Sequence, residues 1–225
     1  MHEDRIDTGR SETEQAIMDA TLNALAKHGY ADLSIQNIGT EFDKSTSLLY
    51  YHYENKDELL LAFLDYVIDL YIATIDRHAD DPDAEIRKFV GYLLPSDDEP
   101  CEGATEPEID ELEVFQRVIF ELRTQTLHDE DYREKFGEME SYMIETVTML
   151  IEREIDAGNY REMDAEMMAE NLMAFLFRTL DMRVTQTRPE SAEAMRKSVY
   201  FLLDHVMPID GQPGDVATSD VDLDL

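Results

Sequence analysis

The chain has 225 residues, 43% of them hydrophobic, which is enough for a real core in one large domain or two smaller ones. Its 52 acidic and 19 basic residues give a formal net charge of −33, but 11 tyrosines, 9 phenylalanines and helical periodicity exclude a disordered acidic chain. It has no apolar run that could span a membrane, no secretory leader and a single cysteine, Cys101, so we expect a cytoplasmic protein without an internal disulfide.

Prolines and caps define the first elements. The seven prolines lie at 82, 95, 100, 107, 189, 208 and 213, so long helices are permitted within 1–81 and 108–188. Ser11 and Glu14 form a capping box that predicts a helix over about 11–28, and Gly29 supplies a left-handed stop.

Two short helices and a longer one are predicted next. Ser34 caps the first short helix, which ends near residue 42. A tight turn follows at Asp43, a residue type that tolerates the left-handed conformation. Ser45 caps the second short helix, which runs to about residue 51, and Asn55 caps a longer helix that runs to about His78.

The rest of the chain is also predicted to be helical. Further helices are expected over about 82–94, 108–127, 129–157, 164–186 and 190–207. The acidic stretch 96–107 is predicted to be a solvated loop. With no strand-like alternation and no repeat of fixed period, the fold class is all-α, with about nine helices.

The two short helices have the layout of a helix-turn-helix unit, because a tight turn joins them and a packing helix precedes them. In such a unit the start of the second helix faces base edges in the DNA major groove, and its ends contact phosphates. Residues 45–56 offer hydroxyls, aromatic donors and one lysine for these contacts. The structural alternative for the tyrosines at 50, 51 and 53 is a buried aromatic corner.

The segment from about Glu12 to Leu61 resembles the DNA-binding domain of TetR-family (TetR/AcrR-like) transcriptional regulators. The pattern LYYHY-x-N-K-x-x-L at 49–59, with LSI-x-x-I at 33–38, carries the resemblance. It implies a helix-turn-helix domain over 1–56 and a ligand-binding and dimerisation domain over 57–207. The remaining stretch, 208–225, is acidic, with two glycines and little apolar content, so we expect it to be a disordered tail. The implied function is a ligand-responsive regulator, by family default a repressor, that binds a palindromic double-stranded DNA operator as a homodimer.

The resemblance also implies roles for single residues. Thr46 and Ser47 would face bases, and Tyr53, at a position that is usually phenylalanine, would belong to the core. The full set of implied DNA-binding residues is Ser34, Ser45, Thr46, Ser47, Tyr50, Tyr51, His52 and Lys56.

The acid excess bears on how such a domain would bind. Residues 1–56 hold 5 basic and 10 acidic residues, unlike most DNA-binding domains. The acidity suggests a highly saline cytoplasm, where carboxylates keep the surface hydrated; the alternative is a mesophilic acidic protein that avoids nucleic acid. At about 1 M salt the Debye length is roughly 3 Å, so close hydroxyl, amide and phenol contacts would replace much of what lysines usually contribute.

The C-terminal part is expected to bind a small molecule of unknown identity. Ten of the twelve methionines lie within 139–207, where they fill an ordinary core or dimer interface, or else line an adaptable pocket. Two arginines in the candidate set would be polar anchors or structural salt-bridge partners. The candidate ligand-binding residues are Tyr66, Phe115, Ile119, Arg123, Tyr142, Met143, Phe175, Phe177 and Arg178.

The stretches 120–136 and 151–184 resemble the BetI-type C-terminal domain of some of these regulators. The helices over about 164–186 and 190–207 would pair with their copies in a second subunit as a four-helix bundle. The apolar residues expected at that dimer contact are Leu172, Phe175, Leu176, Tyr200, Leu203 and Val206.

Enzyme motifs are missing from the sequence. The nine glycines form neither GxGxxG nor a GK[ST] sequence, no HExxH is present, and no histidine follows an acidic residue at the Glu-x-x-His spacing of di-iron bundles. We therefore expect no catalytic residue, metal or cofactor. The competing hypothesis is a helical protein that binds a small molecule or a protein partner without binding DNA.

Overall fold

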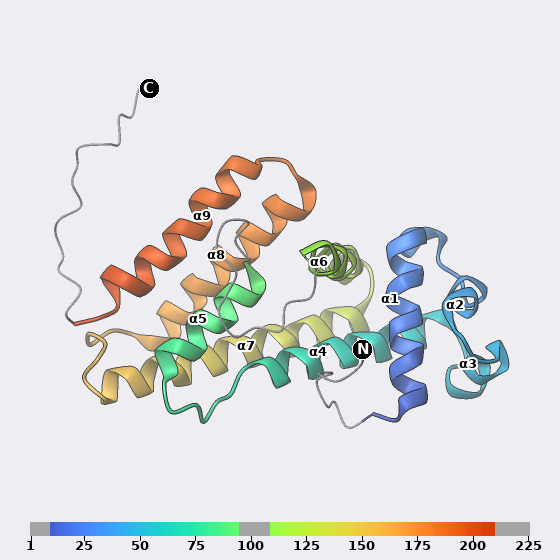
Figure 1. Ribbon diagram of the computed structural model, residues 1–225, viewed down its shortest axis with the longest axis horizontal. Coiled ribbons are helices and arrows are strands. Elements are labelled where there is room, and N and C mark those ends of the chain that lie inside the picture. The colour runs from blue at the N-terminus through green and yellow to red at the C-terminus, as the bar shows by residue number, and fades with distance from the viewer. Residues whose placement is uncertain (1–9, 95–108, 210–225) are drawn as a thin grey trace. The chain divides into compact units, whose positions relative to one another are not determined.

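A computed structural model describes residues 10–94 and 109–209, except for the side chains at 71–74, 109–112 and 189 (Figure 1). Within these ranges the fold is all-α, as predicted, and the only β-type pairing is an isolated bridge between Tyr160 and Pro208. None of the described helices is long and apolar enough to cross a bilayer. The predicted loop containing Cys101 and the predicted acidic tail, apart from its first two residues, lie outside the described residues.

The described chain forms two compact units, each considered separately below. The first unit comprises residues 10–76 and 109–143 and contains α1 (Glu12–Asp32), α2 (Ile35–Glu41), α3 (Thr46–His52), α4 (Lys56–Thr74), α6 (Ile109–Arg123) and the 3-10 helix η1 (Thr124–Leu127). The second comprises residues 77–94 and 144–209 and contains α5 (Pro82–Leu93), α8 (Ala165–Thr185), α9 (Pro189–Phe201) and the π-helix η2 (Leu202–Val206). Helix α7 (Glu130–Asp156) contributes residues to both.

The predicted helix over 55–78 is too long at its C-terminal end. Helix α4 stops at Thr74, and Ile75 takes an extended conformation with its side chain buried. The guanidinium of Arg153 donates hydrogen bonds to the backbone carbonyls of Arg77 and Ala79, at 2.9 and 2.5 Å. Because these carbonyls are satisfied by a side chain of α7, the segment after α4 does not need a helical hydrogen-bonding pattern.

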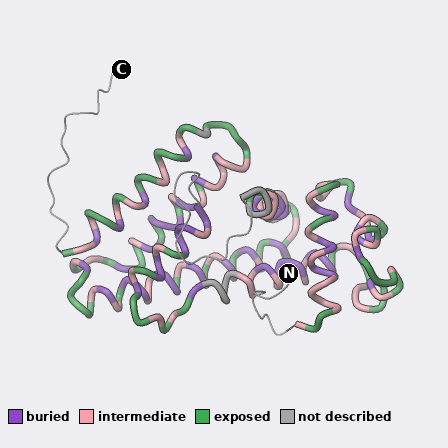
Figure 2. The backbone as a smooth tube through the Cα atoms, in the orientation of Figure 1, coloured by how far each residue is buried: buried purple, intermediate pink, exposed green. Residues whose placement is uncertain are grey.

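The caps predicted from sequence are present in the first unit. Ser11 and Glu14 form the capping box at the start of α1, and Gly29 has φ 68°, so regular helical geometry breaks there. The inner faces of α1 and α4 are fully buried, as the purple segments of Figure 2 show. The side chains with the least exposure on these helices are Ile17, Met18, Thr21, Ala24, Leu25, Leu59, Leu60, Phe63 and Val67.

The C-terminal end of α1 is held by side chains from α4, α6 and α7. The backbone N–H of Tyr30 donates to the carboxylate of Glu121 at 2.8 Å, and its carbonyl accepts from Lys56 Nζ at 3.4 Å. The same ammonium lies 4.6 Å from the centroid of the Tyr30 ring, and the Tyr132 ring meets that ring edge-on at 6.4 Å. A Cβ at Gly29 would come within 3.0 Å of Glu121 Oε1, so the close approach of this carboxylate depends on glycine.

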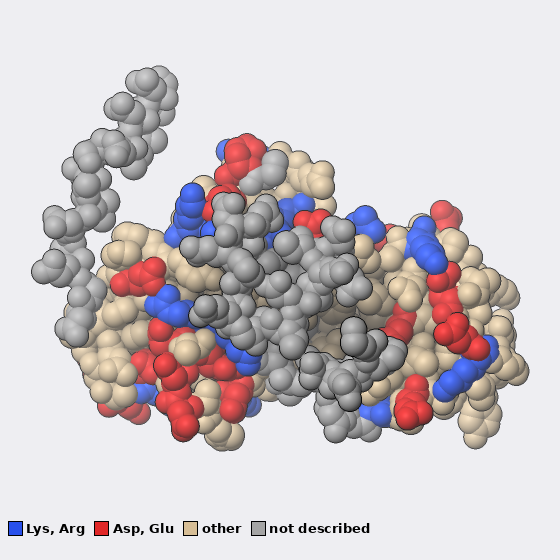
Figure 3. Space-filling view, viewed as in Figure 1, with Lys and Arg blue, Asp and Glu red and all other residues tan. Residues whose placement is uncertain are grey.

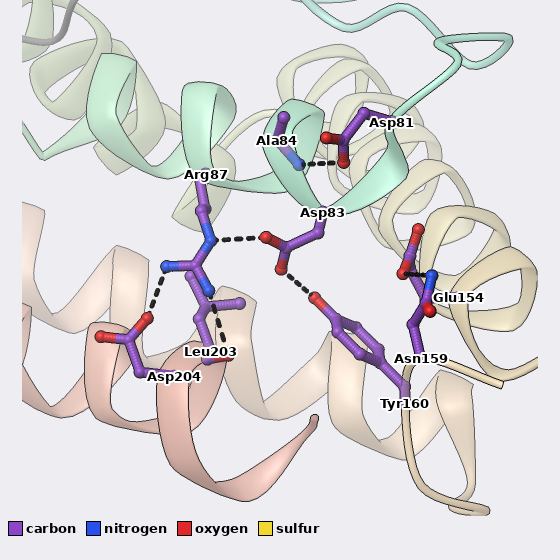
Figure 4. A network of polar contacts seen from close by, with 9 residues as sticks. All are labelled: Asp81, Asp83, Ala84, Arg87, Glu154, Asn159, Tyr160, Leu203 and Asp204. Carbon is purple, nitrogen blue, oxygen red and sulfur yellow. Dashed lines mark hydrogen bonds and ion pairs between the residues drawn. The ribbon is translucent and has the colours of Figure 1, made fainter. Parts of the chain in front are cut away.

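A polar network connects three segments of the second unit (Figure 4). Asp83 of α5 accepts hydrogen bonds from the buried Tyr160 hydroxyl and, at 2.7 Å, from Arg87 Nε. Arg87 also reaches Asp204 at 2.6 Å and the Leu203 carbonyl at 3.1 Å, both in η2. Burial raises the pKa of the Tyr160 phenol, and its hydrogen bond to Asp83 raises it further. The network therefore ties α5 to the end of α9 and to the segment before α8.

Candidate nucleic-acid interface

Helices α2 and α3 are both capped by the serines predicted from sequence. Ser34 accepts from the backbone N–H of Asn37 at 3.2 Å, and Asn37 Oδ1 accepts from the backbone N–H of Ser34 at 2.9 Å. Ser45 accepts from the backbone N–H of Ser47 at 3.4 Å and lies 2.6 Å from its hydroxyl oxygen. These caps satisfy backbone donors that two seven-residue helices would otherwise leave unpaired.

The turn between α2 and α3 does not use a left-handed residue. Gln186 is the one non-glycine residue with positive φ in the described chain, so the left-handed conformation considered for Asp43 is wrong. The chain instead leaves α2 through Phe42 in an extended conformation, with φ −97° and ψ 112°. The Phe42 ring is buried, and its burial fixes the direction of the turn.

Helices α2 and α3 approach each other closely at a glycine. A Cβ added at Gly39 would lie 2.8 Å from Cγ2 and 2.9 Å from Oγ1 of Thr46. Thr46 is half-buried, with its branched end over Gly39. Its assignment as a base-facing residue remains a prediction, and only part of its side chain is accessible.

Several residues of α3 and its cap are exposed, and their side chains are hydroxyl or aromatic groups. Tyr50 is 51% exposed and Tyr51 83% exposed, so neither belongs to a buried aromatic corner. Ser45 and Ser47 are exposed on the same helix. The half-buried ring of His52 meets the ring of Tyr51 edge-on, with centroids 5.4 Å apart.

Tyr53 comes closer to the predicted core position. It is half-buried, its backbone N–H closes α3 by donating to the Leu49 carbonyl at 2.8 Å, and burial raises the pKa of its phenol. Leu49 itself is fully buried and anchors α3 to its neighbours.

We call residues 10–56 the reading head. All of its lysine and arginine side chains make contacts within the protein. Each described lysine or arginine there contacts another residue of the first unit. The pairs are Arg10 with Asp69 at 2.8 Å, Lys27 with Glu41 at 2.5 Å, Lys44 with Thr13 at 3.1 Å and Lys56 with the Tyr30 carbonyl at 3.4 Å. On the face shown in Figure 3, basic side chains of this unit lie beside acidic ones and form no continuous patch. The phosphate contact predicted for Lys56 therefore competes with an existing contact.

Two residues of the reading head were not identified from sequence. Gly39 lies inside the seven-residue helix α2. Glycine is unfavourable inside a helix, so its presence there could have indicated a close approach of another helix. Gln36 Nε2 donates to the hydroxyl of Tyr50 at 3.2 Å, across from α2 to α3. No local pattern marks this pair, because its members are 14 residues apart.

The predicted ligand-binding residues are divided between the two units. Tyr66, Phe115 and Tyr142 are half-buried and Ile119 and Met143 are buried in the first unit; Phe175 and Phe177 are half-buried in the second. Both arginines of the set form ion pairs, Arg123 with Glu140 and Arg178 with Asp181. These pairs agree with the structural alternative for the arginines, while the ligand-binding role of the set stays a prediction. Among the described residues, no group of three or more His, Cys, Asp or Glu side chains is placed to hold a metal ion.

Helices α8 and α9 pack on each other within one subunit. Leu172, Leu176 and Leu203, which were expected at a dimer contact, are fully buried inside the subunit. Side chains buried in this way have no surface left for a partner. The half-buried Phe175, Tyr200 and Val206 remain accessible in part, and Met167 and Phe201 are exposed on the same two helices.

Comparison with known proteins shows that the chain is similar to transcription regulators. Residues 17–63 match the family model described as bacterial regulatory proteins, tetR family. An HTH-type transcriptional regulator of Haemophilus influenzae is 28% identical over 72 residues, which are 32% of this chain and 38% of that protein. The chain thus spans well under half of that relative.

Solved structures match over most of the chain. A TetR transcription regulator from Haloarcula marismortui is 30% identical with a TM-score of 0.74, and the match covers 88% of this chain and 100% of that one. A transcriptional regulator from Saccharomonospora viridis in complex with choline is 20% identical with a TM-score of 0.70, over 88% and 99% of the two chains. The second match concerns the fold alone.

Proposed function

Because the chain belongs to the TetR family of DNA-binding transcription regulators, we propose that it is a ligand-responsive repressor that binds a palindromic operator as a homodimer. The observation that carries the proposal is the outer face of α3, where Ser47, Tyr50 and Tyr51 are exposed on a helix capped by Ser45. Phosphate oxygens and base edges accept hydrogen bonds from such hydroxyls. The DNA-binding set proposed from sequence is kept, with Ser34 contributing the N-terminus of α2.

The proposed chemistry of binding follows from the charge of the reading head. Since its lysines and arginines are engaged internally, neutral donors would make most of the contacts with DNA. A chain with 52 acidic and 19 basic residues fits a protein of a highly saline cytoplasm, where long-range attraction to DNA is screened. We infer a halophilic origin from this charge balance.

The proposed dimer uses α8 and α9. The exposed side chains of Met167 and Phe201, with the accessible parts of Phe175, Tyr200 and Val206, would form the apolar contact between subunits. Two helices from each subunit would make a four-helix bundle. A palindromic operator would then offer one half-site to the α3 helix of each subunit.

The proposed effector response requires a connection between the C-terminal part of the protein, which we propose to be BetI-type, and the reading head. The hydrogen bond from the Tyr30 N–H to Glu121 supplies such a connection, because Glu121 lies on α6 and Tyr30 lies in the last turn of α1. A shift of α6 would leave a partly buried backbone donor unpaired, which costs about 1–3 kcal/mol. An effector that favours the shifted arrangement would change the population of the DNA-binding state.

A band-shift experiment tests the proposal. DNA from upstream of the protein's own gene is titrated with wild-type protein, Tyr50→Ala and a control, Leu127→Ala, which also truncates a side chain with high exposure (75%) in the first unit. Wild type and control should shift the DNA equally, and Tyr50→Ala should shift it weakly. If wild type shifts no DNA at any salt concentration, the competing function, binding of a small molecule or protein partner without DNA, is favoured.

A further inference from the structure

The side-chain contact between Gln36 and Tyr50 joins the two helices of the reading head on its exposed side. Gln36 is the second residue of α2, Tyr50 is the fifth of α3, and both side chains are exposed. The Nε2 of Gln36 lies 3.2 Å from the Tyr50 hydroxyl oxygen. Buried apolar residues already hold α2 and α3 together, so this exposed polar contact is not needed to keep them packed.

The orientation of the Gln36 amide sets the direction of the contact, because its Nε2 faces the phenol. A primary amide nitrogen only donates hydrogen bonds, whereas a phenol has one O–H to donate and lone pairs to accept. With Nε2 facing the phenol, the Tyr50 oxygen accepts, and its own hydrogen remains available for another partner. Phosphate oxygens only accept, so a phenol held in this state is already suited to bind one.

The contact also restricts the motion of Tyr50. An exposed tyrosine that is free to rotate loses side-chain entropy when it is fixed against DNA. A tyrosine already held by Gln36 loses less. The smaller loss of side-chain entropy matters more here than in an ordinary DNA-binding domain, since the described lysines and arginines of the reading head already make contacts within the protein.

We propose that Gln36 is a positioning residue of the DNA interface, which holds the Tyr50 hydroxyl as a hydrogen-bond donor to a backbone phosphate of the operator. The inference rests on the proposed function, in which Tyr50 contacts DNA. In this proposal Gln36 does not contact DNA itself and acts only through Tyr50.

A double-mutant cycle on the full-length protein tests this coupling. Operator affinity is measured by fluorescence anisotropy for wild type, Gln36→Met, Tyr50→Phe and the double variant. Methionine has a similar length and no donor, and Gln125→Met makes the same change on η1 as a control. Gln36→Met should weaken binding about threefold to tenfold, the range of one hydrogen bond, and should have no effect once Tyr50 is phenylalanine.

A second variant tests the direction of the hydrogen bond. Gln36→Glu offers only acceptors, so it should draw the Tyr50 hydrogen away from DNA. At about 2 M KCl, where the added charge is screened within a few ångströms, it should bind more weakly than Gln36→Met. Thermal unfolding of each variant shows whether the fold is kept, because a purely structural role would lower the melting temperature as well.

Four outcomes overturn the inference. If Gln36→Met weakens binding equally in the Tyr50→Phe background, Gln36 contacts DNA by itself. If Gln36→Met binds as wild type does, or Gln36→Glu binds as well as Gln36→Met, Gln36 does not set the donor state of Tyr50, and the proposed function stands without it. If wild type fails to bind any operator, the proposed function fails, and this inference fails with it.

Discussion

Replacing Gly39 by alanine tests whether α2 and α3 pack as closely as the structure shows. The new Cβ would lie 2.8 Å from Cγ2 and 2.9 Å from Oγ1 of Thr46, closer than such atoms come in folded proteins. Overpacking of this kind costs about 1–3 kcal/mol, and alanine is about 1 kcal/mol better than glycine inside a helix. We therefore expect the free energy of unfolding to fall by up to about 2 kcal/mol.

The same substitution should have the opposite effect in a Thr46→Ala protein. Both clashing atoms are then gone, and the Cβ at position 46 lies at an acceptable 3.4 Å. Gly39→Ala should now raise the free energy of unfolding by about 1 kcal/mol, the difference in helix propensity alone.

Urea unfolding of the four proteins, followed by circular dichroism at a fixed high KCl concentration, measures both values. Thr46→Ala alone serves as the reference for the second background. If Gly39→Ala stabilises both backgrounds equally, Thr46 does not lie against position 39.

Three further changes have expected outcomes elsewhere in the chain. Ser34→Ala removes the cap of α2 and should lower the free energy of unfolding by about 1 kcal/mol in urea titrations, and an unchanged midpoint would contradict the capping role. Tyr160→Phe should lower it by about 1.5–3 kcal/mol, the value of a hydrogen bond to the charged Asp83, and a variant as stable as wild type would exclude that bond. Hydrogen bonds from Ser11 lower the pKa of Glu14 below 4.5, so this pair stabilises the fold above that pH and the stabilisation is lost as the pH falls. In acid titrations Ser11→Ala should therefore differ most from wild type near neutral pH, and a difference that grew on acidification would contradict this sign.

The local part of the structure could be predicted from sequence because its signals are local. The caps Ser11, Ser34, Ser45 and Asn55 each bond a backbone N–H two or three residues ahead, so type and spacing suffice to identify them. Gly29 signals its own backbone conformation in the same way. The all-α class and the helix-turn-helix layout follow from such signals.

The contacts on which the proposed roles of Glu121 and Gln36 rest are not local. Glu121 meets Tyr30 across 91 residues, and Gln36 meets Tyr50 across 14. Lys56 had the type and position of a phosphate contact, yet its ammonium lies over the Tyr30 ring. Sequence spacing carries no information on such pairs, because the packing of separate helices creates them.

The residues expected at a dimer contact show a related limit. Apolar spacing along the predicted helices over 164–186 and 190–207 led us to expect Leu172, Leu176 and Leu203 at a dimer contact, whereas the structure buries all three within the chain. It could not distinguish burial within a subunit from burial between subunits. The exposed Met167 and Phe201 became apparent only once α8 and α9 were packed together.

The central claim is that this regulator binds its operator mainly through neutral hydrogen-bond donors of α3. Operator affinity measured from about 0.5 to 3 M KCl tests it most directly, because each phosphate neutralised by a free lysine or arginine steepens the salt dependence. We expect a shallow slope for wild type, and a loss of affinity in Tyr50→Ala that is similar at every salt concentration. A steep loss of wild-type affinity with salt, or equal affinity of wild type and Tyr50→Ala, would contradict it.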